Sequence, residues 1–313
     1  MSGTSTNSFL LRLLSWATLS SICISLVPNV LYETDRVLAI NKPPGIAHHN
    51  DIDSGELGIL NLIRDHYRCN GRNQSDLRLY GVHRLDRVTS GVLLFAKDQG
   101  MARILTAAFR DNRVVKYYVG ISNRQAKSKK QGWVKGELVR GRRKSWYLKH
   151  QHQDGTSKSN NGASNDSSNF SVTRFFAAGL GELDQYRLQA ECRLDKETKP
   201  RTCLLFRPHT GKTHQLRVAA KSLGLPLLGD PVYGEVPSSC SRTCLHAAAV
   251  HVPLEGSGHE SITIWCPPPF VELFWKATAK DPFDSILANL VQKHCESPDV
   301  LSAMTRKQSL SSR

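Results

Sequence analysis

Residues 83–97 read His-Arg-Leu-Asp-Arg-Val-Thr-Ser-Gly-Val-Leu-Leu-Phe-Ala-Lys, a charged and hydroxyl-bearing segment that runs directly into an apolar one. The apolar part, 91–97, predicts a buried strand. Asp86 lies between Arg84 and Arg87, and neighbouring positive charge favours an ionised carboxylate. Such an acid is available as a nucleophile or a base. The alternative is an Asp that caps a turn and pairs with surface arginines.

The segments around this block predict many strands and few helices. Apolar spacing predicts helices over 59–67, 101–109 and 213–223. Short apolar, β-branched or aromatic runs predict further strands at 37–41, 114–121, 170–178, 186–193, 202–208, 246–252 and 261–265. In the strand at 114–121, alternation puts Lys116 and Tyr118 on one side. This pattern predicts an α+β fold.

Three parts of the chain fall outside the predicted domain core. Residues 1–28 form a leader that is predicted to be disordered, 151–169 a disordered insertion without large aliphatic side chains, and 276–313 a loose polar tail. The folded domain is therefore predicted to span 29–275. The leader is marginal for a membrane span and is acid-free and Ser-rich, which is typical of a transit peptide to a mitochondrion or plastid, although it has a single arginine. Without targeting, we expect a cytoplasmic protein.

Basic residues are concentrated in the middle of the chain. The net charge is +15, and residues 101–150 hold 14 Lys or Arg against 2 Asp or Glu. A local excess of this kind favours a polyanionic partner such as nucleic acid, with a solvated face as the alternative. Within 124–149, Trp133, Trp146 and Tyr147 are either stacking platforms along an RNA-binding surface or core residues.

Cysteine spacing and nucleotide motifs exclude several other classes. The eight cysteines form no CxxC pair, so we expect reduced thiols and no metal site. P-loop and GxGxxG motifs are absent from the sequence. An aspartyl-phosphate phosphatase is disfavoured because the acid at position 86 has no DxD partner.

A third informative segment reads Arg-Pro-His-Thr-Gly-Lys-Thr-His-Gln-Leu-Arg over 207–217. A strand ends there and a helix begins, so Arg217 lies in the first turns of that helix. Positive charge is unfavourable near a helix N-terminus. Arg217 is therefore expected to have an anionic partner, either an active-site Asp or a phosphate.

The segments 83–97, 114–121 and 207–217 together resemble the RluA family of RNA pseudouridine synthases. The family signature HRLDxxTSGxLLFAK matches 83–97, the Lys-x-Tyr motif matches 116–118, and the motif TGRxHQ(L/I)R followed by GDPxY matches 210–233. Lys212 stands where the family usually has Arg. Ala219 stands at the position after Arg-Val where the family often has His. Both differences indicate altered RNA contacts. The resemblance covers roughly 30–270. It implies a mixed, mainly antiparallel sheet flanked by helices, with a central active-site cleft.

The resemblance also implies the roles of five residues. Asp86 is the catalytic residue, which acts either as a nucleophile or as a base. Arg217 pairs with Asp86, and Tyr118 stacks on the uracil. Arg84 fills the space that a flipped uridine leaves or holds a phosphate, with a surface salt bridge as the alternative. His83 contacts the RNA or orients the loop of Asp86.

The expected function is the isomerisation of specific uridines in structured RNA, rRNA or tRNA, to pseudouridine. The reaction requires no cofactor and no metal. We expect a monomer without stable membrane association, which recognises RNA through the catalytic domain and its basic segment. The alternative is a non-catalytic RNA-binding or RNA-folding protein on the same scaffold. Asp86, Tyr118 and Arg217 are all present, which favours the enzyme.

Overall fold

The computed structural model describes most of the predicted domain. The described residues are 29–50, 55–69, 78–127, 130–142, 145–149, 169–191, 194–195, 197–237, 240, 242–254, 261–268, 293–295 and 297–305. The predicted leader 1–28 and almost all of the predicted insertion, 151–168, lie outside these residues. The domain limits therefore stay predictions.

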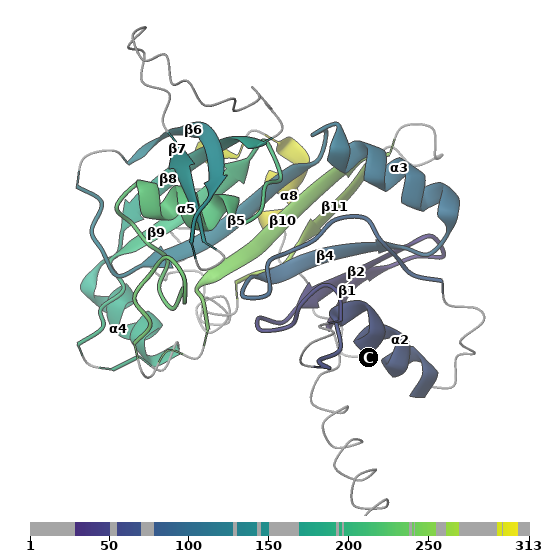
Figure 1. Ribbon diagram of the computed structural model, residues 1–313, viewed down its shortest axis with the longest axis horizontal. Coiled ribbons are helices and arrows are strands. Elements are labelled where there is room, and N and C mark those ends of the chain that lie inside the picture. Colours follow the sequence, from purple (N-terminus) through teal and green to yellow (C-terminus); the bar gives the residue numbers. More distant parts are fainter. Residues whose placement is uncertain are drawn as a thin grey trace, which may run out of the picture.

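One mixed sheet of eleven strands forms the centre of the fold (Figure 1). Its order is β1-β2-β4-β10-β5-β9-β8-β6-β7, with β11 paired to β10 and β3 to β4. The strands are β1 (Asn29–Glu33), β2 (Val37–Lys42), β3 (Tyr80–Gly81), β4 (Ser90–Ala96), β5 (Val115–Ser122), β6 (Gln131–Arg140), β7 (Trp146–Lys149), β8 (Phe170–Gly179), β9 (Thr202–Pro208), β10 (Leu245–Pro253) and β11 (Ser261–Trp265). Among the described pairs, β4–β10 is parallel and the others are antiparallel, so the predicted mixed, mainly antiparallel sheet is confirmed.

Helices cover both faces of the sheet (Figure 1). They are α2 (Ile59–Cys69), α3 (Gln99–Arg110), α4 (Glu182–Glu191), α5 (Gln215–Ser222) and α8 (Pro298–Thr305). One apolar cluster joins α2 to β2 and β4, and another joins α5 to β8 and β9. Tyr118 packs against both clusters, so it lies at the boundary between the two halves of the sheet. This boundary is where the cleft forms.

The parallel contact between β4 and β10 sets the position of the signature segment. Gly91 has φ +111°, and a Cβ atom there would lie 2.2 Å from the carbonyl oxygen of Ala247 on β10. Only glycine tolerates this conformation and this close approach. Gly91 therefore fixes the start of β4 against β10 and, with it, the loop that precedes the strand.

Two elements differ from the sequence predictions. Residues 182–191 form the helix α4, whereas a strand was predicted over 186–193; Leu188 is fully buried in the core. The segment is rich in Glu, Leu, Gln and Arg, which favour helix, and the short alternation was misleading. Within the predicted loose tail, α8 packs against β10 and β11, and the fully buried Val300 anchors it. The prediction of a loose tail is therefore wrong for the residues of this helix.

A search of the described residues for membrane-spanning helices finds none that is long and apolar enough. The same residues contain no group of three His, Cys, Asp or Glu side chains arranged to hold a metal ion.

Candidate active site

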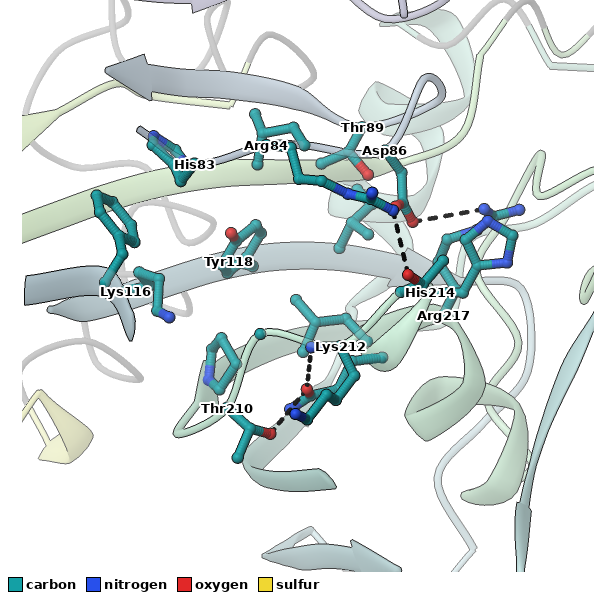
Figure 2. Close-up of a pocket in the computed structure, with 18 of the residues that line it drawn as sticks. His83, Arg84, Asp86, Thr89, Lys116, Tyr118, Thr210, Lys212, His214 and Arg217 are labelled. Carbon is teal, nitrogen blue, oxygen red and sulfur yellow. Dashed lines mark hydrogen bonds and ion pairs between the residues drawn. The ribbon is translucent and has the colours of Figure 1, made fainter. Parts of the chain in front are cut away.

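A cleft of about 360 Å³ opens between the two halves of the sheet (Figure 2). It is lined by the segment 82–86 with Thr89, by β5, by the turn that follows β9 and by the start of α5. Asp86, Tyr118 and Arg217, which lie far apart in the sequence, all line this cleft. The lining residues that bear polar or charged groups are His83, Arg84, Asp86, Thr89, Thr106, Arg110, Lys116, Tyr118, Thr210, Lys212, Thr213, His214, Gln215 and Arg217.

A buried lysine anchors the loop of Asp86. Lys42 is fully buried, and its Nζ donates to the carbonyl oxygens of Pro43 and Ile46, each at 2.8 Å, and of Arg87 at 3.3 Å. A lysine ammonium has three N–H donors, so these bonds use all of them. Lys42 therefore ties the turn after β2 to the residue next to Asp86, which limits the movement of the acid.

A second buried network supports the other end of this loop. Ser90 Oγ lies 2.8 Å from His246 Nδ1 and accepts a hydrogen bond from Arg242, while His246 Nε2 lies 3.1 Å from the carbonyl oxygen of Cys266. Burial, followed by the charge of Arg242, lowers the pKa of His246 to about 3. The neutral ring therefore donates from Nε2 to Cys266 and accepts the Ser90 hydroxyl proton at Nδ1.

This histidine predicts a loss of stability in mild acid. The pKa of His246 is about 3 in the folded protein, against an ordinary value of 6.5, so the unfolded chain binds more protons between these pH values. Stability then falls as the pH drops below 6.5, by about 2 kcal/mol from pH 7 to pH 5 for this residue. Urea unfolding at both pH values should show the loss, and His246→Gln should reduce the difference by that amount. An unchanged difference in the variant would contradict the assignment.

Arg217 contacts two carboxylates, and Asp86 is the weaker partner. Nη1 lies 3.5 Å from Asp86 Oδ2, whereas Nε and Nη2 donate to Asp230 at 2.8 and 2.7 Å. The side chains of Arg217 and Asp230 are 3% and 0% exposed, and that of Asp86 is 19% exposed. Burial alone lowers the pKa of Arg217, but the hydrogen bonds and charge of Asp230, with Asp86 adding to them, raise it overall. The anionic partner predicted from sequence is therefore a pair of acids.

Asp230 holds Arg217 in a fixed orientation. Besides the two guanidinium bonds, Asp230 Oδ1 accepts from the backbone N–H groups of Val232 and Tyr233 at 2.9 and 3.1 Å. The ring of Tyr233 also packs against the guanidinium, 5.1 Å from its carbon atom. A bidentate pair fixes both distance and direction. Nη1 is thereby directed at Asp86.

The arginines on either side of Asp86 bond elsewhere. Arg84 is exposed and donates from Nη2 to Thr213 Oγ1 at 3.1 Å, across the cleft to the turn before α5 (Figure 2). Arg87 donates to the carbonyl oxygen of Gly45 at 2.8 Å and pairs with Glu56 at 2.6 Å. Their proximity to Asp86 in the sequence suggested that both arginines act on it. The guanidinium that contacts Asp86 comes instead from Arg217.

Lys116 and Tyr118 lie side by side along one wall of the cleft (Figure 2). Burial, followed by the charge of Asp86, raises the pKa of Tyr118, so its phenol stays protonated at neutral pH. Lys116 is 7% exposed, and burial lowers its pKa to about 8. Its ammonium lies 5.8 Å from the ring centre of Phe109. The wall therefore combines a hydroxyl donor with a partly desolvated positive charge.

His214 is a site residue that the sequence analysis did not single out. Its φ of +57° is unusual for a residue with a side chain, and it precedes the first turn of α5. Nδ1 lies 2.8 Å from the hydroxyl of Tyr233, which accepts from the backbone N–H of Trp146 at 2.8 Å. Burial lowers the pKa of His214 although Asp86 opposes the shift. The ring is thus neutral at pH 7, and its Nδ1 shares a hydrogen bond with the Tyr233 hydroxyl.

His83 contacts the strand β4 and the helix α3. Its Nε2 accepts from the backbone N–H of Leu94 at 2.9 Å, and its ring stacks on Phe109 with centres 4.3 Å apart. Burial, followed by the charge of Lys116, lowers its pKa to about 3, so the ring is neutral. These contacts favour the second of its two predicted roles, orientation of the Asp86 loop.

Three functional candidates were missed although all three lie within the quoted motifs or beside them. Lys116 belongs to the Lys-x-Tyr motif, His214 to the segment 207–217, and Asp230 to the GDPxY segment. Their positions within those motifs were the sequence feature that could have identified them. What could not be seen is that the 230 region folds back onto Arg217.

The chain is similar in sequence to known proteins. The family model described as RNA pseudouridylate synthase matches residues 36–222, which include Asp86, Tyr118 and Arg217. An uncharacterized RNA pseudouridine synthase of Haemophilus influenzae is 33% identical over 218 residues, covering 70% of this chain and 79% of the relative. The ribosomal large subunit pseudouridine synthase D of Borreliella burgdorferi is 30% identical over 268 residues, covering 84% of this chain and 72% of the relative.

Two further proteins extend the comparison. The tRNA pseudouridine synthase C of Haemophilus ducreyi is 29% identical over 239 residues, covering 71% of this chain and 84% of the relative. Among solved structures, human RNA pseudouridylate synthase domain containing 1 superposes with a TM-score of 0.58 at 24% identity, covering 88% of this chain and 97% of the other. This last similarity concerns the fold.

Proposed function

The chain belongs to the RNA pseudouridylate synthase family, and we propose that Asp86 is the residue that carries out its reaction. The protein is an isomerase that converts uridine in RNA to pseudouridine. Uracil is detached from its ribose at N1 and rejoined through C5, and substrate and product contain the same atoms. The observation that supports Asp86 most strongly is its carboxylate in the cleft, 3.5 Å from a guanidinium that Asp230 holds in place.

Two roles remain for the Asp86 carboxylate. As a nucleophile, one oxygen attacks either C1′ of the ribose or the uracil ring, the C1′–N1 bond electrons leave with the uracil, and the oxygen is released again when C5 is joined to C1′. As a base, the carboxylate takes a ribose proton while the C1′–N1 bond breaks, and returns it once C5 is joined. In both cases the C5 proton leaves and N1 gains one, so the atoms balance. A primary isotope effect from deuterium on the ribose carbon that loses its proton is expected for the second route alone.

The remaining residues of the cleft position the substrate in this proposal. Tyr118 stacks on the uracil, and its protonated hydroxyl faces the reacting centre; a stacked base contributes about 1–3 kcal/mol. Arg217 stabilises and orients the Asp86 carboxylate without touching the base. Lys116 is protonated below about pH 8 and attracts a phosphate or another electronegative group of the bound nucleotide. His83 keeps the Asp86 loop in place.

We infer that a flipped nucleotide enters the cleft beside Arg84. A uridine inside a helix cannot reach Asp86, so it must leave the stack, which costs a few kcal/mol. The side chain of Arg84 spans the cleft and holds Thr213 by one hydrogen bond. We infer that the incoming uridine displaces this contact and that the planar guanidinium then fills the vacated space in the RNA or binds a phosphate.

The substrate class is proposed as structured RNA, either rRNA or tRNA, because relatives named for each kind match the chain. The net charge of +15 supports binding to a polyanion. The predicted monomer and the predicted independence from metals stay proposals, which light scattering and activity after chelation test.

A transcriptome-wide map of pseudouridines tests the function directly. RNA from cells that lack the protein should miss pseudouridine at one or a few positions, and purified protein added to that RNA should restore them without any cofactor. Restoration by the Asp86→Asn variant would contradict the catalytic assignment. If no position changes, the non-catalytic RNA-binding alternative gains support, since that protein would bind the same RNA without modifying it.

A further inference from the structure

Trp133 is a large aromatic side chain that stays 46% exposed on the outer face of β6. Positive groups lie over its ring: Lys135 Nζ is 5.0 Å from the ring centre, and the guanidinium carbon of Arg174 is 5.4 Å from it. Arg174 is the cross-strand partner of Trp133 on β8. An exposed aromatic ring flanked by cations is a feature of surfaces that bind unpaired nucleobases and their phosphates. The other reading is a surface cation–π cluster that adds a little stability.

The position of Trp133 links it to the catalytic cleft. Its ring centre lies 5.0 Å from that of His209, in the turn between β9 and α5. The neighbouring residues Pro208 and Thr210 line the cleft that contains Asp86. The cross-strand pairs put Trp133, Arg174 and Arg207 on the face of the sheet opposite Tyr118, so RNA bound at Asp86 reaches Trp133 around the turn that follows β9.

Within the described part of the chain, His209 carries an unpartnered polar atom beside this cluster of cations. Its Nε2 is buried and has no hydrogen-bond partner among the described residues. Burial lowers its pKa, and the charges of Arg207, Arg174, Lys116 and Lys135 lower it further. A buried polar atom without a partner is uncommon in folded proteins. The cations around His209 and Trp133 attract negative charge to this part of the surface.

The surface next to Trp133 continues as a basic groove. This groove has a volume of about 1500 Å³, and Trp133 and Lys135 lie on its border. Arg124, Lys127 and Arg201 also line it, and none of its described lining residues is acidic. A groove of one charge sign beside an aromatic plate is typical of sites that bind single-stranded nucleic acid.

We propose that Trp133 is a stacking platform for an unpaired base of the RNA that flanks the target uridine, with the neighbouring phosphates over Lys135 and the basic groove. The choice of RNA as the ligand rests on the proposed function. The other predicted platforms differ: Trp146 is partly buried against a small apolar cluster, whereas Tyr147 is 53% exposed on β7. Trp133 is favoured because it alone of the three contacts the turn that borders the cleft, within the contacts the structure describes.

Fluorescence anisotropy with a fluorescein-labelled 12-nucleotide oligo(A) tests this platform. Oligo(A) contains no uridine, so binding is measured without isomerisation. Trp133→Ala should weaken binding about five- to a hundredfold, the range expected for one stacked base. Trp133→Phe should recover most of the affinity because it keeps a ring. Tyr186→Ala, which removes a 72% exposed aromatic from α4, is the matched control and should bind like the wild type.

The charge contribution has its own readout. Lys135→Gln should lower the slope of log affinity against log salt by about one, because one phosphate contact is lost. Oligo(A) affinity of Trp133→Ala within twofold of the wild type would overturn the platform. So would an equal loss in Tyr186→Ala, since the effect would then not be specific to Trp133. A fall in melting temperature with Trp133→Ala that Trp133→Phe repeats without recovering affinity would also overturn it.

The outcome is separable from that of the proposed function. On RNA that contains the target, Trp133→Ala should raise KM while kcat stays close to the wild-type value, because the ring does not touch the reacting base. If the wild type forms no pseudouridine but oligo(A) binding still depends on Trp133, the reaction assignment fails and the platform stands. If pseudouridine forms and oligo(A) binding ignores Trp133, only the platform fails.

Discussion

Replacing Asp86 by asparagine is expected to abolish pseudouridine formation, with a loss of at least about a thousandfold in rate, because removal of a nucleophile or base eliminates the route it opens. Asparagine has the same shape and can still accept a hydrogen bond from Arg217, but it lacks the negative charge and the basicity. A single-turnover assay on the RNA identified by pseudouridine mapping measures the loss.

Stability and RNA affinity of this variant should change little. The Asp86 side chain is partly exposed, and Arg217 retains its two bonds to Asp230, so no buried charge is left alone. Asp98→Asn is the matched control: Asp98 caps α3 and pairs with Arg36 at the surface, and asparagine caps helices about as well. That control should keep full activity. Substantial turnover by Asp86→Asn would refute the central role of the carboxylate.

Replacing Asp230 by asparagine is expected to destabilise the protein by about 3–5 kcal/mol, because it leaves the buried guanidinium of Arg217 without its main counter-charge. The new amide also puts an NH2 group in place of one carboxylate oxygen that accepts from Arg217. Two hydrogen-bond donors then face each other. Urea unfolding should report this loss, with a fall in melting temperature of about 6–20 °C. Activity measured well below that temperature should also fall, because Arg217 no longer holds Asp86 in one orientation.

Two comparisons isolate the cause of the Asp230 effect. Asp98→Asn removes a surface partner with 41% exposure and should cost at most about 1 kcal/mol. Combining Asp230→Asn with Arg217→Met removes the unpaired charge and should restore part of the stability while activity stays low. A cost below about 1 kcal/mol for Asp230→Asn alone would show that the buried pair is not what stabilises the site.

Local sequence patterns were sufficient for much of the architecture. The apolar run 91–97 forms most of β4, and the spacing at 101–109 forms α3. Alternation along 114–121 correctly placed Lys116 and Tyr118 together, and both line the cleft. These features depend on neighbours within a few residues. The strand predicted at 186–193 failed because a short alternating run of good helix formers fits both periods, and the packing of Leu188 decides for the helix.

The residues that act over long distances escaped this kind of reasoning. The sequence suggested that Arg84 and Arg87 would act on Asp86, yet their guanidinium groups bond to Thr213 and to Gly45 and Glu56. The guanidinium that reaches Asp86 comes from 131 residues further along the chain. Its alignment depends in turn on Asp230, which lies in the GDPxY segment but whose contact with Arg217 no local pattern indicated.

The sequence by itself determined the family resemblance, the α+β class, the strong positive charge and the identity of the acid at position 86, because these follow from residue type and short-range spacing. The tertiary structure alone decided that Asp230 orients Arg217, that Lys42 fixes the Asp86 loop and that Trp133 contacts the turn that borders the cleft. Each of these contacts joins segments that only the folded sheet brings together, and burial then makes a wrong or missing partner costly. Short-range sequence patterns carry no information on which distant segments meet or on how deeply their contacts are buried.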